Sequence, residues 1–237
     1  MRWLLGLVLL LVGVLVWFLW KSPMERERPV GKVRKTVSDR VAEFGGVVRE
    51  RLLPRFEKIG VAYPPRKIVF VGLKDERELE VWVSDGGALR HLKTYPILGA
   101  SGKLGPKLAE GDRQVPEGLY CIELLNPNSL FHLSLRVSYP NAFDRAKAEA
   151  EGRTNLGGDI MIHGKRASIG CLAMGDEAAE DLFVLAAEAG VENIAVILSP
   201  VDFRVRSLPD ALPDLPEWTP ELYREIEREL VKLGPSQ

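Results

Sequence analysis

A series of short strand-like segments between residues 67 and 198 restricts the fold more than any other feature of the sequence. Residues 67–71 are rich in β-branched and aromatic side chains, and the Asp-Gly-Gly sequence at 85–87 favours a tight turn between two later segments. Helical patterns interrupt the series at 142–151 and at 176–189. Because strands dominate the middle of the chain, we predict an α+β domain with a mostly β core. The expected strands span residues 67–71, 79–83, 89–95, 119–125, 130–137, 159–163 and 194–198.

An apolar run of 18 residues, 3–20, lies at the N-terminus. As a helix it would be about 27 Å long, enough to span the hydrocarbon core of a membrane, and tryptophans lie at both of its ends. No small-x-small cleavage pattern follows, so we expect an uncleaved signal anchor, with a cleaved signal peptide as the alternative. Six Lys and Arg residues between 21 and 35 follow the run and only Arg2 precedes it. Charge counting alone would therefore place the body in the cytoplasm.

Changes of composition divide the chain into four parts. Residues 24–60 are charged and carry apolar side chains at helical spacing, which predicts a membrane-proximal helix, with 45–46 (Gly-Gly) as a candidate interruption. The C-terminal part is rich in proline and includes an amphipathic pattern at 220–233. We expect a transmembrane signal anchor at 1–21, a helical linker at 22–65, a strand-rich domain at 66–200 and a Pro-rich extension with a helix at 201–237.

Composition argues against two classes of function. The net charge is −1, with 32 basic and 33 acidic residues, which gives no support for binding nucleic acid. Three histidines and two cysteines are too few and too scattered for a structural zinc module, and we expect no metal or organic cofactor. Cys121 lies on an expected strand and is assigned to the core. We expect no disulfide between it and Cys171, because pairing would remove a nucleophile.

Cys171 is the candidate nucleophile. It follows Gly170 in the sequence Ser-Ile-Gly-Cys and lies eight positions after His163, which ends an expected strand. A nearby imidazole lowers the pKa of a thiol and shuttles its proton, as acyl transfer by a thiolate requires. A glycine before the cysteine lets the backbone approach closely, so that the N–H groups of Gly170 and Cys171 can bind an oxyanion. A buried, unreactive cysteine is the alternative for the thiol taken alone.

These residues, together with segments upstream, resemble the L,D-transpeptidase (YkuD) catalytic-domain family over residues 66–200. The sequence 111–120 resembles the family's Thr-Pro-x-Gly-x-Phe/Tyr strand entry, with Val115 in place of threonine. Narrower agreement with the YafK-like branch is found at 102–107, 132–134 and 139–145.

The resemblance implies a β-rich, sandwich-like domain of the cell envelope whose substrates are peptidoglycan stem peptides. By position, Cys171 would attack the carbonyl of a meso-diaminopimelate residue and form a thioester, with His163 as general base. The carbonyl of Gly164 would orient the imidazole, and the N–H groups of Gly170 and Cys171 would form the oxyanion hole. The catalytic domain would then lie in the periplasm, attached by a single helix to the inner membrane, which overrules the charge count.

Two departures from the family pattern affect how the substrate would be held. Ile169 stands where histidine is usual, and Ala173 stands where arginine or asparagine usually holds a stem-peptide carboxylate. Lys165 and Arg166 are candidates to replace that clamp, since Arg binds carboxylates through two hydrogen bonds, and a solvated loop is the alternative. Further substrate-binding candidates are Arg113, Ser168 as a support of the loop, Tyr139 in a turn beside the cleft, and His132, which is otherwise a satisfied histidine on a strand.

Three functions remain open at this point. The first is a cysteine acyl-transferase that works on stem peptides through a thioester on Cys171. The YafK-like branch is linked to amidase activity, so the second is hydrolysis of the diaminopimelate linkage between peptidoglycan and an attached outer-membrane lipoprotein. The third is a non-catalytic peptidoglycan-binding scaffold with a degenerate site, which Ile169 and Ala173 motivate.

Overall fold

The structure is a computed structural model of the 237-residue chain and describes residues 34–208 and 215–234. The expected signal anchor at 1–21 lies outside the described residues, as does the first part of the expected linker. No helix within the two described ranges is long and apolar enough to cross a membrane. The described residues from Lys35 onward group into one unit, in which the helix that precedes the strands and the C-terminal helix both pack with them.

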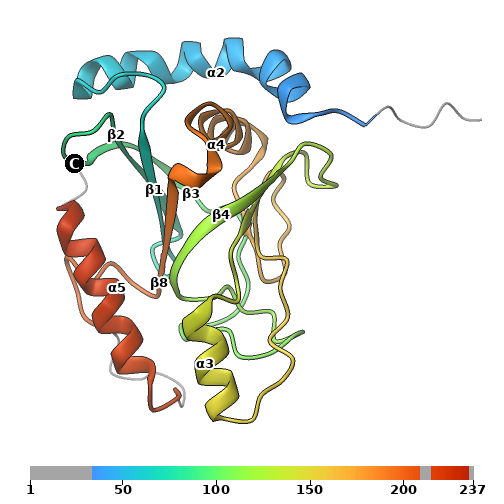
Figure 1. Cartoon of the computed structure of the whole chain (residues 1–237), viewed down its shortest axis with the longest axis vertical. Helices are drawn as coiled ribbons and strands as arrows, with labels where there is room; N and C mark the ends of the chain where they lie inside the picture. The colour runs from blue at the N-terminus through green and yellow to red at the C-terminus, as the bar shows by residue number, and fades with distance from the viewer. Residues whose placement is uncertain (1–33, 209–214, 235–237) are drawn as a thin grey trace, which may run out of the picture. The chain divides into compact units, whose positions relative to one another are not determined.

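Eight strands and four α-helices are present in the described residues (Figure 1). The strands are β1 (Lys67–Leu73), β2 (Glu78–Ser84), β3 (Arg90–Pro96), β4 (Gly118–Asn126), β5 (Ser134–Val137), β6 (Met161–His163), β7 (Leu172–Ala173) and β8 (Ile194–Ser199). The helices are α2 (Val37–Ile59), α3 (Ala142–Ala150), α4 (Asp176–Ala189) and α5 (Thr219–Leu233), with a short 3-10 helix at Val191–Asn193. The expected α+β class is confirmed.

One mixed sheet holds all eight strands, in the order β3-β2-β1-β8-β4-β5-β6-β7. β1 runs parallel to β8, β6 runs parallel to β7, and the other neighbours are antiparallel. β4 pairs with β8 through residues 118–121 and with β5 through residues 122–126. This curved strand therefore joins two halves into one curled sheet (Figure 1). The sandwich-like arrangement that the resemblance implies is corrected to a single sheet, because β4 is shared by both halves.

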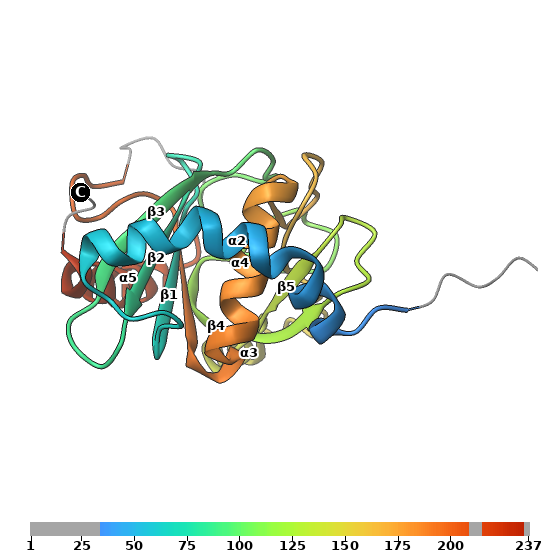
Figure 2. The same ribbon diagram turned by 90° about the horizontal axis from the view of Figure 1, so that it is seen from above.

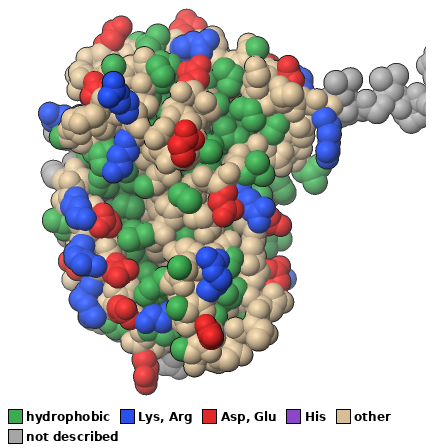
Figure 3. Space-filling view, in the orientation of Figure 1, with side chains coloured by type: hydrophobic (Ala, Val, Ile, Leu, Met, Phe, Trp, Pro, Cys, Tyr) green, Lys and Arg blue, Asp and Glu red, His purple; other side chains and the backbone are tan. Residues whose placement is uncertain are grey.

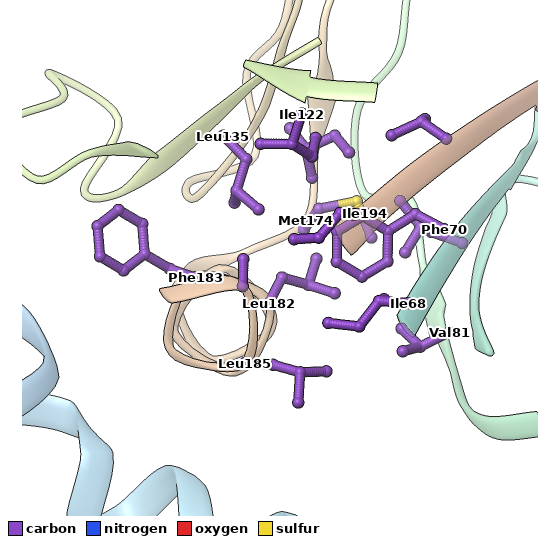
Figure 4. Packing of buried hydrophobic residues seen from close by; sticks show 14 of the residues in the cluster. Ile68, Phe70, Val81, Ile122, Leu135, Met174, Leu182, Phe183, Leu185 and Ile194 are labelled. Carbon is purple, nitrogen blue, oxygen red and sulfur yellow. The ribbon is translucent and has the colours of Figure 1, made fainter. Parts of the chain in front are cut away.

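α4 lies against one face of the sheet and forms the main core with it. Leu182 and Phe183 of α4 are buried in the same cluster as Ile68 and Phe70 of β1 (Figure 4). Burial of such large apolar side chains is the main favourable contribution to folding, at roughly 1.5–3 kcal/mol for each one. α4 also contacts β6, the strand that ends at His163, and Leu172 of β7 is buried in the same cluster.

α2 is the helix that the sequence predicts before the strands. It begins at a capping box on Thr36 and ends at Gly60, whose φ of 66° is the left-handed conformation that glycine adopts without strain. The glycine pair at 45–46 does not interrupt it. Arg51 pairs with the buried carboxylate of Asp181, with 2.7 Å between Nη2 and Oδ1. α2 is therefore docked on the outer side of α4, as the view from above shows (Figure 2).

α5 contributes a second core. Its apolar stripe, which includes Leu222, Ile226 and Leu230, is buried in one cluster with Val69 and Val71 of β1. Those strand residues alternate with the ones that face α4, so α5 covers the opposite face of β1. The solvent side of α5 carries interspersed basic and acidic side chains along the left of the space-filling view (Figure 3).

Two predictions about single strands are wrong in part. Only the second half of the strand expected at 130–137 is present, as β5 (Ser134–Val137). The preceding residues form turns, because His132 has a left-handed φ of 74° and Ser129 Oγ accepts a hydrogen bond from Phe131 N at 3.1 Å. Cys121 is exposed on β4 rather than placed in the core, since its side chain is on the open face of that strand.

Candidate active site

A cavity of about 480 Å³ opens on β4, β5 and β6 and on the loop that connects β6 to β7. Three residues predicted from the sequence line it together, namely Cys171, His163 and Ser168. The rest of the lining includes Asn126, Ser134 and Met161 from the strands and Leu130, Phe131 and Ile169 from the loops.

His163 ends β6 and is buried, with 2% of its surface exposed. Its Nδ1 lies 2.6 Å from the carbonyl oxygen of Gly164. Because a carbonyl only accepts, Nδ1 carries the proton and Nε2 is free to take another. Burial lowers the pKa of His163 below its usual value, and the bond to Gly164 acts in the opposite direction. The resting imidazole, on which the Phe131 ring packs at 4.6 Å between centroids, is therefore a neutral base near pH 7.

Cys171 lies directly before β7. The parallel pairing of Ile162 with Leu172 brings the thiol and the imidazole to adjacent strands. Sγ accepts a hydrogen bond from Met161 N at 3.4 Å and donates one to Asp159 O at 3.6 Å. The short interval between the histidine and the cysteine thus places both side chains on one cavity, as the sequence predicts.

The thiol of Cys171 is held in its protonated form. Burial raises its pKa above the usual range, the hydrogen bond from Met161 N partly offsets this, and the Asp159 charge raises the pKa further. Within the residues that the structure describes, the imidazole of His163 makes no hydrogen bond to Sγ. The resting site therefore holds a thiol and a neutral imidazole, and the lowering of the thiol pKa by His163 stays a prediction.

The two backbone donors expected to bind an oxyanion already have partners. Gly170 N donates to Ser101 Oγ at 2.7 Å, and Cys171 N donates to Ser168 Oγ at 3.1 Å. Ser101 Oγ in turn donates to Arg113 O at 2.7 Å. Gly170 needs its glycine, because its φ of 80° is strained for other residues. Sequence reasoning missed Ser101, although it directly precedes the segment that agrees with the YafK-like branch.

The basic residues near the site do not clamp a carboxylate over the cavity. Lys165 Nζ pairs with Asp176 Oδ2 at 2.6 Å, and Lys165 N donates to Oδ1 of the same side chain at 2.8 Å. The charge of Lys165 is thereby paired at the start of α4, and its role in binding substrate stays a prediction. Arg166 and Arg113 are exposed and lie outside the cavity lining.

Two other candidates also face away from the cavity. His132 Nε2 lies 3.0 Å from Glu180 Oε1, and its ring meets Phe44 edge-on, so it belongs to the contact of α2 with α4. Tyr139 is buried and its hydroxyl donates to Leu156 O at 3.2 Å. Neither residue lines the cavity. The structure places His132 and Tyr139 in contacts between elements outside the cavity lining, and their substrate-binding roles stay predictions.

The two departures from the family pattern lie in different surroundings. Ala173 is fully buried in β7 and forms a bridge with Gly99. A Cβ placed on Gly99 would lie 3.4 Å from Ala173 Cβ, so this contact suits small residues. Ile169 is 73% exposed and Leu130 is 94% exposed, and both line the cavity. The cavity rim is therefore apolar where the family pattern has histidine.

The cavity combines the parts that nucleophilic acyl transfer needs. It is lined by a thiol and by a neutral imidazole whose Nε2 makes no hydrogen bond among the described residues. The N–H groups of Gly170 and Cys171 lie at its edge, bound to the hydroxyls of Ser101 and Ser168. Over residues 34–208 and 215–234, no three His, Cys, Asp or Glu side chains are arranged to hold a metal ion.

The model of the YkuD family, the L,D-transpeptidase catalytic domain, matches residues 66–196. YafK of Escherichia coli (strain K12) and YafK of Escherichia coli O157:H7 are each 38% identical to the chain over 112 residues. The match covers 46% of this chain and 43% of each relative, so the chain spans less than half the length of these curated proteins.

Two solved structures of low sequence identity are similar to part of the chain. The helical cell shape determining protein Pgp2 from Campylobacter jejuni is 21% identical, with a TM-score of 0.47 over 62% of this chain and 54% of its own. Bd1075 of Bdellovibrio bacteriovorus is 18% identical, with a TM-score of 0.42 over 72% of this chain and 56% of its own.

Proposed function

The chain belongs to the L,D-transpeptidase (YkuD) catalytic-domain family, and we propose that it transfers acyl groups of peptidoglycan stem peptides through a thioester on Cys171. One observation carries the proposal: the Cys171 thiol and a neutral His163 imidazole, with Nε2 free, line a single cavity. The family acts on peptidoglycan, which supports stem peptides as the substrate class.

In the first step, the thiol proton passes to Nε2 of His163 and Sγ bonds to the carbonyl carbon of the substrate. The resting thiol donates to Asp159 O, so the Cys171 side chain must leave that carbonyl when the substrate binds. Nδ1 stays bonded to Gly164 O, which stabilises the imidazolium. When the tetrahedral adduct collapses, its C–N bond breaks, the leaving amine takes the proton from Nε2, and the thioester remains.

The N–H groups of Gly170 and Cys171 are the proposed donors to the oxyanion of the tetrahedral adduct. In the resting site they donate to the hydroxyls of Ser101 and Ser168. A charged oxygen accepts more strongly than a hydroxyl, so the adduct would displace both serine oxygens. Rotation of the two serine side chains is sufficient for this exchange, and the backbone of the loop can stay in place.

In the second step, an acceptor attacks the thioester, and His163 carries the acceptor's proton to Sγ. An amine acceptor gives a cross-link, and water gives hydrolysis. Hydrolysis is the second candidate, because only residues 164–170 separate His163 from Cys171, so this loop provides little cover and Cys171 is partly exposed. A hydrolase of this kind would cut the diaminopimelate linkage between peptidoglycan and an attached lipoprotein.

The proposed location is the periplasm, with residues 3–20 as an inner-membrane anchor. The length of that apolar run supports an anchor, and membership of a cell-envelope family supports the periplasmic side. Two reporters fused after Gln237 test this location, one that is active only in the periplasm and one that is active only in the cytoplasm. Only the periplasmic reporter should show activity. Activity of the cytoplasmic reporter alone would overturn this location.

The proposed reaction is tested by incubating the purified full-length chain with diaminopimelate-containing muropeptides, including forms that carry a lipoprotein remnant. Mass spectrometry of the products separates the two reactions. New cross-linked dimers or exchanged termini would establish acyl transfer to an amine, and loss of the lysine-linked remnant without new cross-links would establish hydrolysis. Binding without turnover by the wild-type chain would overturn the proposed chemistry and leave a scaffold.

A further inference from the structure

The cavity floor continues into a charged group that the proposed acyl transfer does not use. β5 and β6 pair so that Ser134 lies opposite His163 and Arg136 lies opposite Met161. Alternate residues of a strand share a face, so Arg136 lies on the same face of β5 as Ser134 and next to the cavity that Ser134 lines. Met161 N donates a hydrogen bond to Cys171 Sγ. Arg136 is therefore paired in the sheet with the residue that contacts the nucleophile.

Arg136 stands between two carboxylates without a hydrogen bond to either. Its Nη2 lies 3.4 Å from Asp159 Oδ1, and its Nε lies 3.5 Å from Glu123 Oε2. Nε is buried and, among the described residues, donates to no acceptor. Exposed ion pairs of this length contribute little to stability, and a buried donor without an acceptor opposes folding. Folding therefore does not explain the arrangement.

Asp159 connects this charged group to the nucleophile. Its backbone carbonyl accepts the thiol proton of Cys171. Its side chain lines the cavity and is 79% exposed, so the carboxylate is open to a ligand. A group bound between Asp159 and Arg136 would thus lie next to the carbonyl that Cys171 attacks.

We propose that Arg136 and Asp159 form a subsite for a free α-amino-acid end group, an ammonium and a carboxylate on one carbon. The end group would belong to the side chain of the residue whose carbonyl Cys171 attacks, and the inference rests on the proposed acyl transfer. The substrate carboxylate would bind the fork of Arg136, and the ammonium would bind Asp159.

The three charges of the subsite distinguish this ligand from simpler ones. A simple anion would face the carboxylates of Asp159 and Glu123, which flank the guanidinium. A simple cation would pair with Asp159 and leave Arg136 without a substrate partner. A zwitterion presents its carboxylate to Arg136 and its ammonium to Asp159. This explains how a substrate carboxylate would be held near Cys171 although Ala173 carries no clamp and Lys165 is paired with Asp176.

Three acyl donors that differ only in the end group test the subsite. They are stem peptides with meso-diaminopimelate, with diaminopimelate amidated at the side-chain carboxyl, and with L-lysine. For the full-length wild-type chain, kcat/KM on the first should exceed that on the others by about 10- to 100-fold. Arg136→Met should lower kcat/KM on the diaminopimelate donor to the level of the amidated and L-lysine donors. It should change kcat/KM on those two donors little. Asp159→Asn, which tolerates the same left-handed φ of 54°, should lower all three because each carries the ammonium.

Two controls separate recognition from folding. Arg224→Met is the matched substitution on α5 and should change none of the three values. Labelling of Cys171 by iodoacetamide does not involve the end group, so its rate should be unchanged in Arg136→Met. Slower labelling together with equal losses on all three donors would assign Arg136 to folding and overturn the subsite.

The failures of the two proposals are distinguishable. Equal kcat/KM of the wild-type chain on the three donors would overturn the subsite and leave acyl transfer intact. No turnover of any donor by the wild-type chain would overturn the proposed function, and the subsite with it.

Discussion

Replacing Glu117 with glutamine tests the buried ion pair that ties the C-terminal helix to the sheet. Glu117 is fully buried at the start of β4. Its Oε1 accepts hydrogen bonds from Lys74 Nζ and Gly105 N, both at 2.8 Å. Its Oε2 accepts a hydrogen bond from the Tyr223 hydroxyl of α5 at 2.7 Å. One carboxylate therefore joins the end of β1, the loop after β3 and α5.

Glutamine has nearly the same shape but no charge, so the ammonium of Lys74 would stay buried without a counter-charge. Burial already lowers the pKa of Lys74, and the Glu117 charge acts against that decrease. Removing one partner of a buried pair costs about 3–5 kcal/mol. Each kcal/mol shifts the melting temperature of a domain of this size by about 2–4 °C. Glu117→Gln should therefore lower the melting temperature by about 6–20 °C.

Thermal unfolding followed by circular dichroism at pH 7 measures the change. Tyr223→Phe is the matched control, because it removes one hydrogen bond and leaves the two charges paired, at a cost of about 1.5–3 kcal/mol. Lys74→Met/Glu117→Gln should be more stable than Glu117→Gln alone, since it removes the unpaired charge. A melting temperature of Glu117→Gln within about 2 °C of the wild type would refute the reasoning.

Three further predictions concern the site. In a Cys121→Ser background, alkylation of Cys171 by iodoacetamide should slow about tenfold per pH unit below pH 8, because the raised thiol pKa leaves little thiolate; a rate that stays level down to pH 5 would indicate an ion pair with His163. The acid limb of kcat/KM should lie below pH 6.5, since the lowered pKa of His163 keeps the imidazole neutral there, and a midpoint above 7 would contradict this. Gly99→Ala should lower kcat/KM at least about tenfold in turnover assays, because its Cβ would lie 2.3 Å from Arg166 O and displace the catalytic loop; unchanged turnover would refute that.

Elements with local signals are predicted well from the sequence. The helix expected at 176–189 is confirmed as α4, because Asp176 and Glu177 favour its N-terminus and Gly190 follows its end. The amphipathic pattern at 220–233 is confirmed as α5, one residue longer at its start. The seven residues between His163 and Cys171 are likewise enough to predict that one loop connects them on a single cavity.

Features that depend on distant contacts could not be predicted. β7 is only two residues long and exists because it pairs with β6. Ser101 meets Gly170 across 69 positions of sequence. Lys165 looks free beside His163 in the sequence, and only the fold brings Asp176 to neutralise it. The raised pKa of the thiol follows from burial in three dimensions, which neighbouring residues in the sequence do not reveal.

The central claim is a thioester on Cys171, and intact-protein mass spectrometry after acid quenching tests it most directly. The full-length wild-type chain mixed with a diaminopimelate-containing stem peptide should gain the mass of the peptide less its leaving group. His163→Gln should form this adduct at least about 100-fold more slowly, because the thiol loses its base, and Cys171→Ala should not form it. Product accumulation by Cys171→Ala, or turnover by the wild-type chain without any adduct under conditions that trap one, would contradict the account.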